Sequence, residues 1–596
     1  MSEETKQKVL KGGEFIIKES DPQSVFTMDD LSEEQRMIAE TAREFVEKEI
    51  VPNLEDIEKQ KEGLSPSLME KAGEIGLLGT AIPEEYGGLG EDFDTNTILA
   101  MEMGNAHSFG VTFAAHTGIG TLPILYYGTE EQKKKYLPGL ASGELKAAYC
   151  LTEPTSGSDA LSAKTTATLS EDGNYYILNG QKMWITNGGF ADILITFAQV
   201  DGDKFTSFII PTDSEGFTKG EEENKMGIKG SSTRALFLDN VKVPKENVLG
   251  EIGKGHYIAF NVLNVGRFKL GAMVTGGAKK SLSIAVQYAN ERKQFGRPIS
   301  SFGAIKYKLA EMATRIFVSE ASVMRTSGLI NQMSEELKAE GKSFSESWIS
   351  SAEEYAIESS MMKVFGSEVL DYVVDETVQV HGGYGYSEEY PAARAYRDSR
   401  INRIFEGTNE INRLLVVDML MKRSMKGRID LLTPAMAIQK ELMSVPEFGN
   451  EPEGFLAKEM KAIQNAKKAA LMVAGSAVQK FMQKLAEEQE LIMNITDMLT
   501  EIYTAESAIL RSQKRALTQG EESAKYFETM TKLYVSDALE RINLFGKHAI
   551  TSFAEGDELK MLLLGLKRFT KFDPVNTTAL RRQIADKLIE ENKYCF

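Results

Sequence analysis

The chain has 596 residues, enough for about four domains at roughly 150 residues each, so a single small binding module is excluded. Its 42% hydrophobic and 26% charged residues are typical of a globular protein and exclude a disordered or collagen-like chain. The 69 basic and 87 acidic side chains give a net charge of −18, which disfavours nucleic acid as a partner.

Cysteine and histidine content restricts the kinds of site that the chain can build. The two cysteines, Cys150 and Cys595, cannot form a disulfide framework, which favours the reducing cytoplasm. The five histidines include no pair at metal-ligand spacing, so we expect no metal site. No run approaches the roughly 18 apolar residues of a membrane-spanning helix, and residues 1–20 lack the features of a signal or transit peptide.

The first half of the chain predicts a helical domain followed by a β domain. Over residues 31–149 apolar side chains recur at helical spacing, as Met37, Ile38 and Phe45 illustrate. Over residues 150–252 β-branched and aromatic segments alternate with Asp-Gly, Asn-Gly and Pro turns, a pattern typical of β-strands.

The second half predicts helices throughout. Long helical patterns occupy residues 253–428, and a connector with Pro434, Pro446 and Pro452 leads into a helical tail over residues 453–596. We therefore expect a multidomain α+β fold with a helical domain, a central β domain, a helical bundle domain and an added C-terminal bundle. One apolar stripe in the tail is especially clear: Leu491, Ile492, Ile495, Met498, Leu499, Ile502 and Tyr503.

Two motifs in the β domain have the chemistry of a cofactor site. The small residues of 152–159 leave backbone N–H groups and hydroxyls free for a phosphate or a ring carbonyl, although taken alone such a run favours a solvated turn. Trp184 and Thr186 share one face of a predicted strand because side chains alternate along it. An aromatic ring beside a hydroxyl suits a planar heterocycle, but a core tryptophan would give the same spacing.

Two more motifs lie in the third predicted domain. Residues 290–298 end a helix with two arginines and an aromatic ring, which could hold a phosphate and stack on a base, or form an ordinary basic helix end. Glu406 follows two apolar residues and precedes a glycine, with Thr408 or Asn409 placed to cap the next helix. Apolar neighbours would raise the pKa of the Glu406 carboxyl into a range that is useful for a base.

In this order the motifs resemble those of the acyl-CoA dehydrogenase family. The resemblance covers about residues 31–425, and the added tail is similar to that of the very-long-chain branch. The segments that carry it are Cys150–Asp159, Lys182–Gly188, Arg292–Gly296, Gln379–Gly385 and Arg403–Asn409.

The resemblance implies FAD as the cofactor. Trp184 would lie against the isoalloxazine ring, with Thr186 hydrogen-bonded near its N5. Arg292 and Phe295 would meet the pyrophosphate and adenine, while residues 379–383 would reach the FAD of a neighbouring subunit. The implied cofactor-binding residues are Tyr149, Leu151, Thr152, Ser158, Trp184, Thr186, Arg292, Phe295, Gln379, Gly382, Gly383, Thr408 and Glu410.

The resemblance also implies Glu406 as the base that removes the α-proton of an acyl-CoA thioester, while the β-hydrogen leaves as hydride. Some members of the family carry the base on a helix of the third domain, but the matching segment 263–268 contains no carboxylate. The small residues of 115–121 resemble the wall of an acyl tunnel. The implied substrate-binding residues are Ser158, Asn264, Arg267 and Gly407.

The implied activity is the oxidation of long-chain acyl-CoA to trans-2-enoyl-CoA in fatty acid β-oxidation, with electron-transfer flavoprotein as the electron acceptor. A site shared across an interface implies a homo-oligomer, and the tail favours a dimer. We expect no membrane association, because the stripe helix is acidic on its polar face. An acyl-CoA oxidase that uses O2 and a flavin-binding scaffold without turnover remain alternatives.

Overall fold

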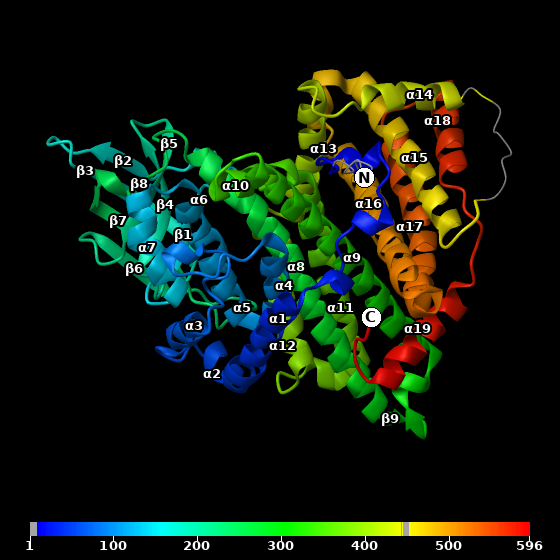
Figure 1. The fold of residues 1–596 in the computed structure, drawn as a ribbon, viewed down its shortest axis with the longest axis horizontal. Coiled ribbons are helices and arrows are strands. Elements are labelled where there is room, and N and C mark those ends of the chain that lie inside the picture. Colours follow the sequence, from blue (N-terminus) through cyan, green and yellow to red (C-terminus); the bar gives the residue numbers. More distant parts are fainter. Residues whose placement is uncertain (1–8, 443, 445–451) are drawn as a thin grey trace, which may run out of the picture.

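The computed structural model describes residues 9–442, 444 and 452–596, and its four groups of elements follow each other along the chain (Figure 1). The first group is helical. A capping box of Ser32 with Gln35 begins its first helix, and a second box of Thr129 with Gln132 begins its last. Its helices are α1 (Glu33–Phe45), α2 (Leu54–Glu58), α3 (Leu64–Glu74), α4 (Phe93–Met103), α5 (His107–Ala114), α6 (Leu122–Tyr127) and α7 (Glu130–Ser142).

The second group is an eight-stranded sheet with the order β6-β7-β3-β2-β4-β5-β8, in which β1 pairs in parallel with β4. β3 pairs with β7 in an antiparallel register that shifts between Lys182 and Ile185, so the strand bulges there. The strands are β1 (Ala147–Cys150), β2 (Thr166–Leu169), β3 (Tyr175–Thr186), β4 (Ile193–Val200), β5 (Lys204–Pro211), β6 (Phe217–Glu222), β7 (Thr233–Pro244) and β8 (Val248–Leu249).

The third group consists of long helices beside the sheet domain and a short hairpin, β9 (Lys293–Gln294) with β10 (Arg297–Pro298). Figure 1 places this group between the sheet and the tail. Its helices are α8 (Gly255–Glu291), α9 (Gly303–Ala339), α10 (Phe344–Glu354), α11 (Ala356–His381), α12 (Pro391–Ser399) and α13 (Asn409–Met425).

The tail is a helical bundle packed on this third group. The predicted stripe belongs to α16, and all seven of its apolar side chains are buried. Part of the predicted connector forms helix α14. Pro434 lies in the first turn of that helix, where its missing N–H is tolerated. Pro446 lies outside the described residues. The tail helices are α14 (Leu432–Leu442), α15 (Ala457–Phe481), α16 (Gln489–Gln519), α17 (Lys525–Thr551), α18 (Gly556–Phe569) and α19 (Thr577–Glu591).

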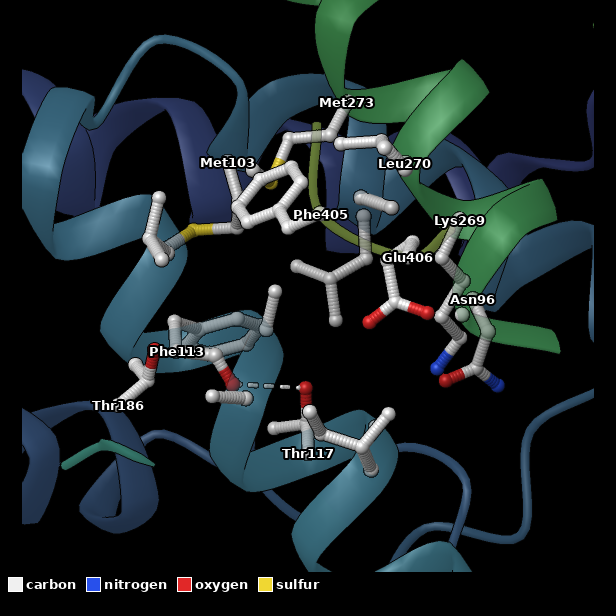
Figure 2. Close-up of a pocket in the computed structure, with 18 of the residues that line it drawn as sticks. Asn96, Met103, Phe113, Thr117, Thr186, Lys269, Leu270, Met273, Phe405 and Glu406 are labelled. Atoms are coloured by element: carbon white, nitrogen blue, oxygen red, sulfur yellow. Dashed lines mark hydrogen bonds between the residues drawn. The ribbon is translucent and has the colours of Figure 1, made fainter. Parts of the chain in front are cut away.

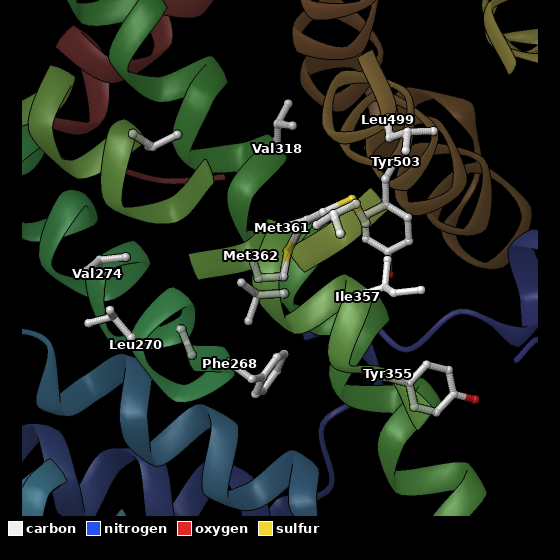
Figure 3. Close-up of a cluster of buried hydrophobic side chains, with 14 of the residues drawn as sticks. Phe268, Leu270, Val274, Val318, Tyr355, Ile357, Met361, Met362, Leu499 and Tyr503 are labelled. Atoms are coloured by element: carbon white, nitrogen blue, oxygen red, sulfur yellow. The ribbon is translucent and has the colours of Figure 1, made fainter. Parts of the chain in front are cut away.

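One apolar core joins helices of the third group to the tail. Figure 3 shows Met361 and Met362 of α11 between Phe268 of α8 and Tyr503 of α16. Polar contacts cross the same boundary, since the Tyr503 hydroxyl lies 2.8 Å from that of Thr326 on α9. The tail is therefore an integral part of this fold. None of the helices in the described part of the chain has the length and apolar character to span a bilayer.

The charged side chains of α15 and α16 also contact the rest of the protein. Glu506 of α16 is buried between Arg325 of α9, at 2.9 Å, and Lys467 of α15. Asp497 on the predicted acidic face accepts a 2.7 Å hydrogen bond from Arg413. The lysine-rich helix α15 therefore turns its apolar side chains and part of its charge into the bundle.

Candidate active site

A mainly apolar cavity lies between α4, α8 and the π-helical turn Ala115–Gly120, and Glu406 forms part of its wall (Figure 2). Thr186 from the end of β3 lines it as well, so the sheet and both helical domains contribute. The other lining residues are Thr80, Asn96, Leu99, Ala100, Met103, Val111, Phe113, Ala114, Ala115, Thr117, Gly118, Ile119, Gly266, Lys269, Leu270, Met273 and Phe405.

Glu406 is held by its backbone rather than by its side chain. It has the left-handed φ of 57°, which is costly for a residue with a side chain, and the following Gly407 has φ 80°. The Glu406 carbonyl accepts hydrogen bonds from Arg267 Nε at 3.2 Å and from Asn412 Nδ2 at 3.3 Å. Its Oε2 is buried and makes no hydrogen bond within the described part of the chain. A strained, anchored backbone thus presents a free carboxylate oxygen to the cavity.

Burial raises the pKa of the Glu406 carboxyl to about 7, while the positive charges of Arg267 and Lys363 oppose that shift. Lys363 of α11 donates hydrogen bonds to the Gly407 carbonyl and to Asn409 Oδ1, both at 2.7 Å. Its own pKa is lowered to about 7, chiefly by burial. Glu406 is therefore ionised for much of the time at neutral pH and can accept a proton.

Gly266 lets α8 pass directly beside this carboxylate. A Cβ built at position 266 would lie 2.8 Å from Glu406 Oε2, closer than real Cβ atoms approach such neighbours. Segment 263–268, which the sequence singled out as an alternative place for the base, therefore faces the same spot. With glycine there, Glu406 supplies the carboxylate and α8 supplies the space.

The bulge in β3 exposes an aromatic face next to the cavity. Trp184 has φ 55° and its side chain is 61% exposed, although the strand around it is largely covered. Two residues later Thr186 reaches the cavity wall. The Met183 N–H donates to the Thr152 carbonyl at 2.9 Å, which places the predicted loop 152–159 against the bulge. An exposed indole, a hydroxyl and a small-residue loop meet here and fit the ring system of the flavin that the resemblance implies.

A second hollow collects other predicted FAD residues. Arg292 lies over the Tyr384 ring at 5.4 Å from its centroid, and Gly382 and Gly383 line the same hollow. Phe295 is 92% exposed at the tip of the β9–β10 hairpin. Figure 1 shows this hairpin at the end of the helical domain away from the sheet. The predicted FAD residues thus form two separate groups within this chain, and a cofactor site shared with a second subunit stays a prediction.

The remaining predicted residues divide between buried and accessible positions. Tyr149 is buried and donates a long 3.5 Å hydrogen bond to the Ala259 carbonyl, and Leu151 is also buried. Ser158, Gln379 and Glu410 are exposed. Thr408 caps α13 by accepting from the Ile411 N–H, and Asn264 accepts from Arg267 Nη1 at 2.9 Å. Binding roles for all of these residues remain predictions.

Models of known protein families match most of the chain. They are the N-terminal, middle and C-terminal domains of acyl-CoA dehydrogenase over residues 32–144, 148–241 and 253–421, and a further acyl-CoA dehydrogenase C-terminal domain over residues 465–568. A probable acyl-CoA dehydrogenase of Bacillus subtilis is 48% identical over 588 residues, which cover 98% of each chain. The chain belongs to the acyl-CoA dehydrogenase family.

Two further comparisons refine the position of this acyl-CoA dehydrogenase. The very-long-chain specific enzyme of rat mitochondria is 35% identical over 85% of this chain and 78% of its own length. A crystal structure of an acyl-CoA dehydrogenase from Bacillus anthracis, complexed with FAD, has a TM-score of 0.96 at 48% identity and covers 98% of this chain and 100% of its own. The predicted family, fold class and type of enzyme are confirmed, and the predicted cofactor agrees with that complex.

Sequence reasoning missed three residues of this site. Lys363 interrupts the apolar run of α11, and a lysine at a buried helical position was a signal that could have been read. Gly266 carried no local signal, because its role depends on how close α8 comes to Glu406. Lys269 follows one turn later on α8 and also lines the cavity.

Replacing Arg292 with Ala should lower FAD occupancy more than helical content, because a pyrophosphate would lose a charge-assisted donor. The Arg292 side chain is exposed and packs on the Tyr384 ring, so the fold should tolerate the change. The flavin-to-protein absorbance ratio after purification and far-ultraviolet circular dichroism measure the two quantities. Equal flavin content in both proteins would remove Arg292 from the cofactor site.

Proposed function

We propose that this enzyme oxidises long-chain acyl-CoA to trans-2-enoyl-CoA with FAD as its cofactor and passes the electrons to electron-transfer flavoprotein. The observation that carries the proposal is the free Oε2 of Glu406, which faces an apolar cavity also lined by Thr186. A base, an apolar cavity and a flavin-compatible edge meet at one point. The similarity to dehydrogenases of the very-long-chain branch supports the substrate class and the acceptor.

In this proposal Glu406 Oε2 removes the α-proton of the bound thioester. The Glu406 backbone N–H makes no hydrogen bond within the described residues, so it is available to polarise the thioester carbonyl. FAD, when bound, supplies the acceptor for the β-hydride. Arg267 fixes the Glu406 backbone through its carbonyl, and the apolar wall excludes water from the reacting carbons.

The small residues in the cavity wall are evidence in favour of a long acyl chain as the substrate. Ala114, Ala115 and Gly118 present little or no side chain, and a Cβ built at Gly118 would meet no atom within 4 Å. Anaerobic titration of the flavin spectrum with acyl-CoAs from 4 to about 20 carbons tests the proposal. Long chains should bleach the flavin at the lowest concentrations. Bleaching by short chains alone would overturn the long-chain assignment, and no bleaching by any acyl-CoA would overturn the activity.

The acceptor requires its own test. Enoyl-CoA formation should depend on added electron-transfer flavoprotein, with little oxygen consumed in its absence. Rapid oxygen uptake in step with product formation would instead favour the acyl-CoA oxidase alternative. A cytoplasmic location is also part of the proposal, and it rests on the low cysteine content.

Flavin reduction should increase with pH through the pKa of Glu406. Only the ionised carboxylate can take a proton, and burial places the pKa of this group near 7. The single-turnover reduction rate should therefore be low near pH 5.5, rise around pH 7 and level off above it. Stopped-flow absorbance at saturating substrate gives the profile, with FAD content checked at each pH. A rate that falls with increasing pH across this range would contradict the assignment of Glu406 as the base.

We expect a homodimer. The separation of the predicted FAD residues into two groups supports a second subunit, and the tail helix α16 packs on α9, where shorter relatives are expected to place a second dimer. Light scattering of the FAD-loaded enzyme should give twice the mass of the 66.0 kDa chain. A tetramer would contradict this expectation.

A further inference from the structure

Lys269 places a positive charge in the wall of the acyl cavity. It lies on α8, one helical turn after Gly266, and its neighbours on that wall include Leu270 and Met273. Figure 2 shows its amine on the cavity side of α8, below Glu406 and near Asn96. A lysine at this position is unexpected, because an acyl chain offers an ammonium group no hydrogen-bond acceptor.

No hydrogen bond or ion pair joins Lys269 to any residue that the structure describes, and burial alone lowers its pKa to about 8. The other lysines whose pKa is lowered by burial all have an acceptor. Those acceptors are Glu153 for Lys182, the Gly189 carbonyl for Lys219, the Ser231 carbonyl for Lys225, Glu320 for Lys279, the Gly407 carbonyl and Asn409 for Lys363, and Glu506 for Lys467.

The polar neighbours in the cavity neither accept a hydrogen bond from the Lys269 ammonium nor neutralise its charge. Thr80 donates its hydroxyl to Asn96 Oδ1 at 2.9 Å, and Asn96 Nδ2 donates to the Asp92 carbonyl at 2.8 Å, so these groups are already paired with each other or with backbone. Glu406 is the one carboxylate in the cavity lining, and no ion pair joins it to Lys269 within the described residues. Lys269 is partly buried, and an ammonium group held in an apolar wall without an anion is costly unless the occupant of the site supplies one.

We propose that Lys269 is a specificity residue that favours acyl-CoAs whose chain carries a second carboxylate, the CoA monoesters of dicarboxylic acids. The ammonium would pair with that carboxylate inside the cavity while the thioester lies at Glu406. A carboxylate both neutralises the charge of the ammonium and accepts its hydrogen bonds, whereas a hydroxyl only accepts hydrogen bonds. The inference deepens the proposed function, since it rests on this cavity being the acyl site and names a narrower class of substrate.

The experiment compares chains of equal length that end in a methyl group or in a carboxylate, over about 8 to 18 carbons. The readout is the ratio of kcat/KM for the two substrates, measured for the wild-type holoenzyme and for Lys269→Met, which keeps the length of the side chain but removes its charge. For at least one chain length the wild type should favour the carboxylate. The variant should lower that ratio by about tenfold or more, the effect of one charge-assisted hydrogen bond.

Lys280→Met is the matched control, because Lys280 lies on the same helix but is exposed to solvent. This control should leave the ratio unchanged. The inference is overturned if the wild type favours the methyl-ended chain at every length, or if Lys269→Met and Lys280→Met give the same ratio as the wild type. Either result with efficient flavin bleaching by methyl-ended chains leaves the proposed function standing, whereas failure of all acyl-CoAs to bleach the flavin would remove both. The wild-type comparison is decisive even if Lys269→Met folds poorly.

Discussion

Glu406→Gln should reduce flavin reduction by acyl-CoA by about 10²–10⁴-fold or more, because an amide cannot accept the α-proton. The change is nearly isosteric, and Glu406 Oε2 makes no hydrogen bond within the described residues that the amide would break. FAD content and acyl-CoA binding should therefore be retained. Stopped-flow absorbance of the flavin measures reduction, and equilibrium titration of the oxidised spectrum measures binding.

Glu558→Gln gives a matched control for the same chemical change at an exposed position of α18. It should reduce its flavin as fast as the wild type does. Reduction of the Glu406→Gln flavin at the wild-type rate would refute the assignment of the base. Loss of FAD from Glu406→Gln would show instead that this side chain supports the cofactor site.

The second large effect is expected from Lys182→Met. Lys182 and Glu153 form a 2.6 Å ion pair in which both side chains are almost fully buried. Burial acts to raise the pKa of Glu153, but Lys182 and hydrogen bonds from residues 164 and 165 bring it below its ordinary value. Removing the lysine would leave a buried carboxylate without its cation, at a cost of about 3–5 kcal/mol in the free energy of unfolding.

This ion pair also anchors the start of the predicted loop 152–159. Lys182 Nζ donates to the Leu151 carbonyl at 3.4 Å, and the adjacent Met183 N–H donates to Thr152. Lys182→Met should therefore lower FAD occupancy together with stability. The double variant Glu153→Leu/Lys182→Met should recover part of the stability, because no charge is then left buried. Chemical denaturation measures the free energy, with Lys204→Met of the exposed Lys204–Asp201 pair as a control that should change little. A Lys182→Met protein as stable as the control would show that the pair contributes nothing.

Much of the fold follows from sequence periodicity. The seven-residue stripe of α16 is buried because its spacing matches the helix repeat, and the capping box at Ser32 marks the start of α1. Other boundaries depend on tertiary packing. α16 continues to Gln519, well beyond the predicted stripe, because Ala508, Ile509 and Leu510 remain buried against its neighbours. The local sequence therefore does not show where such a helix ends.

Residues of the candidate site could be predicted where a single segment of sequence carries their signal. They were missed where their role depends on contacts between segments that are distant in sequence. Glu406 could be singled out because its carboxylate lies between two apolar residues and a glycine within one short segment. The bulge that exposes Trp184 depends on how β3 pairs with β7, which no spacing reveals. Gly266 and Lys269 belong to the site because α8 passes beside Glu406, and that approach is a property of the folded chain.

Exchange of the α-hydrogen tests the central claim, proton removal by Glu406, most directly. The substrate is an α-deuterated long-chain acyl-CoA in which sulfur replaces the β-carbon, so that no β-hydride can leave and proton transfer is isolated from flavin reduction. Loss of deuterium to water, followed by mass spectrometry, should be rapid with the wild-type holoenzyme. With Glu406→Gln it should fall by about 10²–10⁴-fold or more, while Glu558→Gln exchanges normally. Exchange by Glu406→Gln at the wild-type rate would show that another group removes the proton and would contradict the mechanism.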